Sequence, residues 1–278
     1  MTSPGYFRAI RLMAIIFCGL LFLLPLWWVT ISALRPEAEI FRYISPIGPW
    51  TILPLNPTLE NMIALWQTPF ARAIFNSVFL AALTVIGGLI VCSLAAFALA
   101  AMEFKGRELV FSLIVISFLI PFDSIALPLY GMMRSANLQN TYFGLVLPGI
   151  GNGLAIFLLR QFFLGLPKEL REAAMVDGLG WFGVFWRIYL PLSGNALLSA
   201  AMMLFIYQWQ AYLWPLLIAP APEFKVAAVA IAQFSDMYGA SYGLIFSAAV
   251  FISLIPMLIL GIFQRYFNLS VASTGGKE

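Results

Sequence analysis

The chain has 278 residues, of which 62% are hydrophobic and 10% are charged, and its mean hydropathy is +0.95. About a quarter of the residues in a soluble domain are charged, so this composition indicates a protein of the lipid bilayer. The net charge of +3 is small, and the basic residues of the chain are scattered along the sequence. This pattern excludes a basic patch of the kind that binds nucleic acid. The chain contains no histidine, which excludes a histidine metal site, a Ser-His-Asp triad and a Cys-His nucleophile. We therefore expect no catalytic chemistry, no metal site and no nucleic-acid partner.

Six apolar stretches are long enough to cross a membrane as helices, which takes about 20 mostly apolar residues each. They cover residues 10–34, 71–101, 109–133, 142–165, 192–218 and 241–266. Arg8 and Arg11 precede the first stretch, as in a signal peptide, but its apolar run exceeds the usual length of about 7–15 residues. We expect it to be retained as an anchor. The sequence predicts an all-α membrane protein in which residues 1–278 form one domain with six transmembrane helices.

The distribution of Lys and Arg over the connections predicts the orientation, because these residues gather on cytoplasmic loops. One set of alternate connections holds Arg8, Arg11, Lys105, Arg107, Arg160, Lys168, Arg171, Arg187, Arg265 and Lys277. The other set holds Arg35, Arg42, Arg72, Arg134 and Lys225. We expect both termini and the loop 166–191 to be cytoplasmic, and residues 35–70 to be external. The Pro-dense part of that external segment, residues 42–58, cannot hold a regular helix and is interpreted as an ordered loop.

The most polar connection contains "REAAMVDGLGWFGVFWRIYLP", residues 171–191. Pro167 and Glu169 favour the start of a helix. Gly178 and Gly180 permit the backbone conformations that stop it. Helical spacing puts five residues along one shallow stripe: Leu166, Leu170, Ala173, Ala174 and Asp177. We expect a helix, a glycine turn and a second helical segment that ends at Pro191, all lying at the cytoplasmic membrane surface.

Two interpretations of this loop remain open on the residues alone. An ordinary loop with an amphipathic, membrane-lying helix explains the pattern. The alternative is a protein interface, which Asp177 favours. An exposed acid in the last turn of a helix interacts unfavourably with the helix dipole, at a cost of about 0.3–1 kcal/mol. Such a residue calls for a partner, either Arg187 or a group on another protein.

The loop resembles the EAA motif of ABC importer permeases, in which EAA, three residues, Gly and nine residues precede I-x-L-P. The matching residues are Glu172, Ala173, Ala174, Gly178, Ile188, Leu190 and Pro191. Other stretches resemble the maltose-type, carbohydrate-uptake branch of that family: "NSVFLAALT" (76–84), "IPFDSIALPLYGMM" (120–133), "LQNTYFGLVLP" (138–148), "FLLRQFF" (157–163) and "YQWQAYLWPLLIA" (207–219). The resemblance covers nearly the whole chain. Asp123 in "PFDS" departs from the Val or Gln of many relatives.

This resemblance implies a permease subunit that forms half of the path of an ATP-driven importer for a sugar or related polyol. The loop 166–191 would hold the coupling helix, with Glu172 and Asp177 as polar groups, Ala173 and Ala174 as the packing face, and Gly178 as the turn. The implied partners are a second homologous permease subunit, two copies of a cytoplasmic ABC ATPase that carry ATP and magnesium, an external solute-binding protein and membrane lipid. The chain itself would bind no cofactor, and it would lie in a bacterial or archaeal inner membrane as a multi-pass protein.

Polar and aromatic residues within spans are candidates for the substrate path, because unsatisfied polar groups in hydrocarbon are costly and tend to face the bundle interior. Amides and aromatic faces suit a polyhydroxylated solute. The candidates are Asp123, Tyr130, Asn152, Tyr207, Gln208, Trp209, Gln210, Tyr212 and Trp214. Rings near span ends also act as interface anchors, and amides between helices also act as glue.

Alternative functions follow from the same features. Glycerol phosphate or its diester is a second solute class within the resembling family. A stand-alone secondary transporter or channel is the alternative from another class, although Asp123 is the main acid within a span that such a protein would use for proton coupling. A membrane scaffold without transport would not need the intramembrane polar cluster. The sequence holds no GxxxxGK[ST] phosphate loop, so ATP hydrolysis would take place on a partner.

Overall fold

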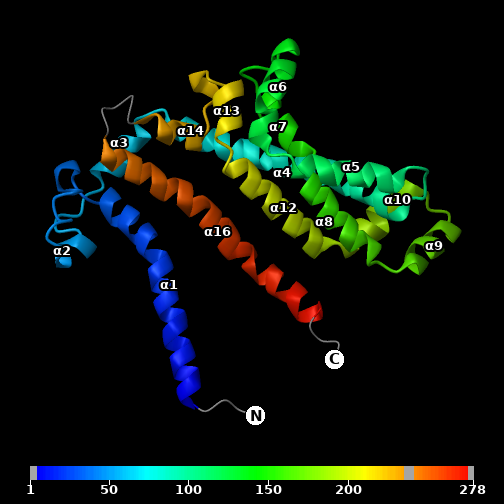
Figure 1. Cartoon of the computed structure of the whole chain (residues 1–278), viewed down its shortest axis with the longest axis horizontal. Helices are drawn as coiled ribbons and strands as arrows, with labels where there is room; N and C mark the ends of the chain where they lie inside the picture. The colour runs from blue at the N-terminus through cyan, green and yellow to red at the C-terminus, as the bar shows by residue number, and fades with distance from the viewer. Residues whose placement is uncertain (1–4, 235–240, 275–278) are drawn as a thin grey trace. The chain divides into compact units, whose positions relative to one another are not determined.

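The computed structural model describes residues 5–234 and 241–274, and these residues form helices and connecting loops with no strand. The helices are α1 (Gly5–Ala33), α2 (Pro49–Ile52), α3 (Glu60–Trp66), α4 (Phe70–Ala101), α5 (Arg107–Leu119), α6 (Phe122–Ser135), α7 (Tyr142–Ile150), α8 (Gly153–Leu164), α9 (Lys168–Val176), α10 (Trp181–Val184), α11 (Leu190–Leu192), α12 (Gly194–Trp209), α13 (Leu213–Ile218), α14 (Ala227–Ala232) and α16 (Tyr242–Thr274) (Figure 1). The all-α fold class is therefore confirmed.

Three of the six predicted spans are long, continuous helices. The apolar segments Ala9–Ala33, Phe70–Ala101 and Tyr242–Gln264 each have the length and hydropathy to cross a membrane. The other three are bent pairs, formed by α5 with α6 (102°), α7 with α8 (41°), and the segment Trp181–Leu192 with α12 (84°). The described part of the chain thus has three such helices, or up to six spans if each bent pair counts as one.

The predicted spans 109–133, 142–165 and 192–218 are therefore each interrupted by a break in the helix, a feature that the sequence analysis did not predict. Pro121 explains the first break, since a proline disfavours helix at the preceding residue, and Ile120 is extended with φ −72° and ψ 123°. The second break falls at Gly151, after which Asn152 caps α8. In the third stretch α12 ends at Trp209 and α13 begins only at Leu213.

The described chain divides into two compact units, which are described separately. The first unit contains residues 1–71 and 230–255, and the second contains residues 72–229 and 256–278. The prediction that residues 1–278 act as a single permease domain stays a prediction.

Arg35 organises the loop segment of the first unit. Its side chain is fully buried, and Nη2 donates to the carbonyl oxygens of Trp50 (2.6 Å), Thr51 (3.0 Å) and Leu53 (3.4 Å). Burial lowers the pKa of this guanidinium from its ordinary value, while the nearby Glu39 raises it. Backbone carbonyls that a helix or sheet would have satisfied are thus paired with one cation. The expected ordered loop over residues 42–58 is present, with the short helix α2 inside it.

Glu37 connects this loop to the start of α16 within the same unit. Its carboxylate accepts from the backbone nitrogens of Tyr242 and Gly243, each at 2.7 Å. An acid at this end satisfies free N–H groups and complements the helix dipole.

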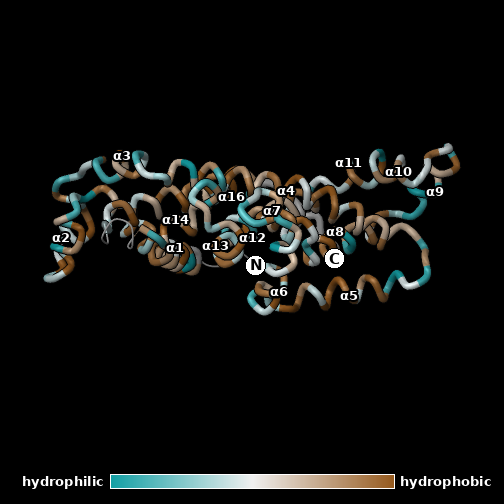
Figure 2. The backbone as a smooth tube through the Cα atoms, turned by 90° about the horizontal axis from the view of Figure 1, so that it is seen from above, coloured by the Kyte–Doolittle hydropathy of each residue, from teal (hydrophilic) through white to brown (hydrophobic). Residues whose placement is uncertain are grey.

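The core of the second unit lies among α4, α8, α12 and the π-helical segment Phe185–Tyr189. Tyr189 stands edge-on to Phe97 and Phe163, with ring centroids 4.8 and 5.4 Å away. Gly88 allows α4 and α12 to approach closely, because a Cβ there would lie 2.8 Å from Leu204 Cδ1. Within this unit α9 lies at one end, away from α6, α7 and α13 (Figures 1 and 2).

Candidate functional site

The loop 166–191 begins with α9, as the sequence predicts. Pro167 is the N-cap and Glu169 lies in the first turn. The helix ends at Asp177, and Gly178 then adopts φ +86°, the left-handed conformation that favours glycine. Gly180 has an ordinary extended backbone with φ −75° and ψ 171°. Only the first of the two glycines is therefore required by the turn.

The two alanines of the EAA sequence do not share one surface. Ala174 is buried in the core of the second unit, whereas Ala173 is exposed. Adjacent residues of an α-helix point about 100° apart, so one contiguous stripe cannot include both equally. The outward face of α9 instead presents Glu172, Ala173 and Val176, of which Val176 is 88% exposed. Such an exposed apolar residue beside acids suits a protein interface.

Asp177 has no ion-pair partner within the described residues, and neither has Arg187. Both side chains are exposed. The intramolecular pair that the sequence suggested is therefore not formed. Glu172 has a neighbouring cation, since its Oε1 lies 3.5 Å from Arg171 Nη2.

The second half of the loop is helical throughout. It runs through α10, the π-helical segment Phe185–Tyr189 and α11. Ile188 and Leu190 are half-buried and pack against the core of the second unit, and Pro191 lies in the first turn of α11. The I-x-L-P residues therefore attach the loop to the core, and α9 carries the outward face.

Two arginines bind the C-terminal end of α4 to this part of the chain. Arg171 of α9 donates from Nη1 to the carbonyl oxygen of Ala101 at 2.7 Å. Arg160 of α8 donates from Nε to the carbonyl oxygen of Leu99 at 3.1 Å and from Nη2 to Glu108 at 2.7 Å. The last carbonyls of a helix lack partners within it, and cations are favoured there. Arg171 therefore fixes the loop to α4 by one charge-assisted hydrogen bond, and Arg160 fixes α8 to the same helix end.

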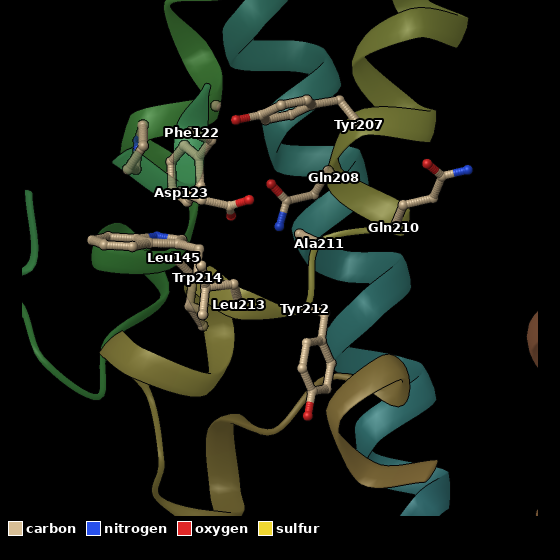
Figure 3. Close-up of a pocket in the computed structure, with 12 residues that line it drawn as sticks. Phe122, Asp123, Leu145, Tyr207, Gln208, Gln210, Ala211, Tyr212, Leu213 and Trp214 are labelled. Atoms are coloured by element: carbon tan, nitrogen blue, oxygen red, sulfur yellow. The ribbon is translucent and has the colours of Figure 1, made fainter. Parts of the chain in front are cut away.

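A cavity of about 370 Å³ lies elsewhere in the second unit. This size lies within the range of roughly 300–1,000 Å³ that suits small-molecule sites. The lining residues come from α6, α7, α12, α13 and the break between α12 and α13 (Figure 3): Phe122, Asp123, Leu145, Pro148, Gly149, Tyr207, Gln208, Gln210, Ala211, Tyr212, Leu213 and Trp214. A discontinuous helix next to a cavity is a recurring arrangement at transporter binding sites.

The polar groups of this cavity are held in different ways. Gln208 is 7% exposed, and its Oε1 accepts from Thr84 Oγ1 of α4 at 3.2 Å. Trp214 is fixed by a bond of 2.9 Å from its Nε1 to the carbonyl oxygen of Gly144. The Asp123 carboxylate and the Gln208 amide point toward one another, whereas the Gln210 and Tyr212 side chains point away from them (Figure 3). The cavity therefore contains one fixed amide and one exposed acid on facing elements.

Six of the nine path candidates line this cavity: Asp123, Tyr207, Gln208, Gln210, Tyr212 and Trp214. The other three have local partners. Tyr130 accepts a hydrogen bond of 2.7 Å from Gln139, Asn152 caps α8 by accepting from the Ala155 N–H, and Trp209 stacks on Phe205. Their place in a substrate path stays a prediction.

Sequence reasoning missed the apolar residues of the lining and the anchor Thr84. Pro148 and Gly149 gave a signal, since helix breakers inside an apolar run mark irregular backbone. A Cβ on Gly149 would lie 3.0 Å from Thr84 Cγ2 and 3.4 Å from Gln208 Oε1, so glycine at this position leaves room for that pair. Thr84 itself gave no signal beyond its polarity.

The two loop glycines supply a matched pair of substitutions. Valine at position 178 meets no steric clash but must adopt a left-handed conformation, which costs roughly 1–2 kcal/mol. We expect Gly178→Val to speed amide hydrogen exchange across residues 168–180 by about 5–30-fold. Gly180→Val, at an ordinary φ with open space around it, should leave exchange unchanged. Equal protection in the two variants would contradict the assigned turn.

Comparisons with known proteins identify the family and the relatives that the sequence resembles. The family model described as the binding-protein-dependent transport system inner membrane component matches residues 88–273. The arabinooligosaccharides transport system permease protein AraQ of Halalkalibacterium halodurans is 34% identical over 269 residues, 94% of this chain and 93% of the relative. The sn-glycerol-3-phosphate transport system permease protein UgpE of Yersinia pestis is 32% identical, over 89% of this chain and 90% of the relative.

Two solved structures share the fold. A chain of a bacterial ABC transporter involved in the import of the acidic polysaccharide alginate has a TM-score of 0.82 at 21% identity, covering 96% of this chain and 99% of its own. A chain from a bacterial alginate ABC transporter in complex with an alginate pentasaccharide-bound periplasmic protein has a TM-score of 0.60 at 18% identity, covering 92% and 93%. The chain belongs to the family of binding-protein-dependent transport system inner membrane components, as a multi-pass permease subunit.

Proposed function

We propose that the chain forms half of the translocation path of an ATP-driven importer for a sugar or related polyol. The observation that carries the proposal is the connection of the exposed face of α9 to the cavity through one helix. Arg171 binds the end of α4, and Thr84 on the same helix binds Gln208 in the cavity. The names of the relatives support a carbohydrate or polyol as the solute.

The remaining subunits follow from this role. A cytoplasmic ATPase in two copies supplies hydrolysis, with ATP and magnesium bound there. A second, homologous permease subunit completes the path, since a cavity on one subunit forms only one side of it. An external solute-binding protein delivers the solute, and the complex between a similar transporter and a periplasmic protein supports this partner.

The outward face of α9 is the docking surface for the ATPase. Glu172 and Asp177 supply negative charge without strong internal pairing, and Val176 supplies an apolar contact. Docking would bury Val176 and give Asp177 the partner that it lacks within the described chain. Movement of the ATPase would then reach α4 through Arg171 and the core contacts of Ile188 and Leu190.

The orientation that this role requires has both termini and the loop 166–191 in the cytoplasm. In a protein without Cys18 and Cys92, we expect Lys105→Cys, in the exposed connection between α4 and α5 that the same basic-residue count places in the cytoplasm, to react with a membrane-impermeant thiol reagent only after the membrane is opened. Ser45→Cys in the external loop should react in intact cells. Reversed labelling would contradict the proposed topology.

Docking is tested by placing a charge on the exposed face of α9. Val176→Asp should bury an unpaired carboxylate at the interface and reduce retention of the ATPase and ATP-driven uptake by at least about ten-fold. The matched control is Ile47→Asp, because Ile47 is 83% exposed and lies in the external loop segment. The control should keep the ATPase bound throughout purification.

Two outcomes would count against the proposal. Normal uptake by the Val176→Asp importer with its ATPase bound would show that α9 is only a surface loop. Solute accumulation that needs a proton gradient and no ATPase would favour the stand-alone secondary transporter instead. Co-purification of an ATPase with the wild-type chain distinguishes these cases before any uptake assay.

A further inference from the structure

The cavity described above has a one-sided charge pattern. Asp123 is the acid among its lining residues, and within the described part of the chain no lysine or arginine lines it. Its side chain is exposed and makes no ion pair in the described residues. An anion that entered this cavity would therefore approach an uncompensated carboxylate from this subunit.

The ends of two helices that border the cavity also affect its electrostatic potential. The C-terminal end of α12, at Trp209 and Gln210, presents the negative end of its dipole beside the cavity. The N-terminal end of α6 is the opposing feature, because a helix N-terminus attracts anions. Asp123 lies in the first turn of α6 and already places a negative charge there. The carboxylate of Asp123 thus offsets the positive potential at the N-terminal end of α6.

The remaining polar groups suit hydroxyl groups. A carboxylate accepts two hydrogen bonds from neighbouring hydroxyls. Thr84 holds the Gln208 Oε1, whereas the Gln208 Nε2 has no hydrogen-bond partner among the described residues and can donate to a solute. Tyr207 and Tyr212 are 41% and 44% exposed and supply ring faces for C–H groups. A phosphate or uronate would need donors or cations where this cavity has a carboxylate.

We propose that this cavity selects uncharged polyhydroxylated solutes over anionic ones, and that Asp123 is the residue that determines this specificity. The inference rests on the proposed function and narrows its solute class. It favours a neutral oligosaccharide, as in the name of the arabinooligosaccharide permease. It disfavours a glycerol phosphate or an acidic polysaccharide, as in the names of the other relatives.

The test measures equilibrium binding to the purified importer, with both permeases and the ATPase but without the solute-binding protein. The probes are a panel of neutral oligosaccharides that includes arabino-oligosaccharides, sn-glycerol 3-phosphate and an alginate oligosaccharide. The variants are Asp123→Asn and Asp123→Lys, with Glu223→Gln as control, since Glu223 is also exposed but does not line the cavity. ATP-driven uptake of the same probes by reconstituted vesicles is the second measurement.

We expect the wild-type importer to bind a neutral probe and neither anion. Asp123→Asn should weaken that binding by at least about ten-fold, since one carboxylate oxygen becomes an amide donor and the remaining acceptor loses its charge. Asp123→Lys should also strengthen binding of an anionic probe by at least about ten-fold, while Glu223→Gln changes neither. If Asp123 served only to complement the α6 dipole, both Asp123 variants would lose thermal stability and keep the wild-type preference.

Four results would overturn the inference. One is wild-type binding of glycerol phosphate or the alginate oligosaccharide at least as tight as that of the neutral probes. Another is a preference that Asp123→Lys leaves unchanged. If ATP hydrolysis drives accumulation of an anionic probe, the inferred selection against anions is wrong, but the proposed importer function holds. If ATP drives uptake of no probe, the proposed function fails and the inference with it.

Discussion

The C-terminal carbonyl groups of α4 impose the constraint on which the second unit depends. A 32-residue helix that ends inside a packed unit leaves acceptors without partners, and their burial is costly unless donors reach them. Arg160 and Arg171 supply those donors from α8 and α9. The bond from Arg171 also places the loop 166–191 against the helix that carries Thr84. One electrostatic requirement therefore explains how the loop 166–191 is attached to the helix that also contacts Gln208.

Two breaks in the helices place residues at the cavity that continuous helices would not place there. Residues 210–212 line the cavity because α12 has ended and α13 has not begun, and Asp123 lies next to it because α6 starts after Pro121. Irregular backbone at such a place is tolerated where it lines a cavity instead of facing lipid. The breaks before α6 and between α12 and α13 thus shape the cavity, and the long helices α1, α4 and α16 provide regular structure.

Composition and periodicity predicted the helical fold, α9 and the turn at Gly178, because these depend on local chemistry. Six of nine path candidates meet at one cavity, because polar groups within apolar segments avoid hydrocarbon and face the interior of the helix bundle. The break at Ile120 has a local signal in Pro121, but the break at Ser193 and the division of Ala173 from Ala174 depend on packing that no local pattern specifies. The contact from Thr84 to Gln208 joins residues 124 positions apart and has no signal in either segment.

The central claim is that movement of α9 reaches the cavity through α4. The most direct measurement is the ATP-dependent change in hydrogen exchange at residues 207–214 of the reconstituted importer. The account predicts that Arg171→Met keeps the ATPase bound but loses this change, because the bond to the Ala101 carbonyl is gone. Arg187→Met, which removes an exposed arginine of the same loop, should preserve it. A full response at residues 207–214 in the Arg171→Met importer would contradict the account.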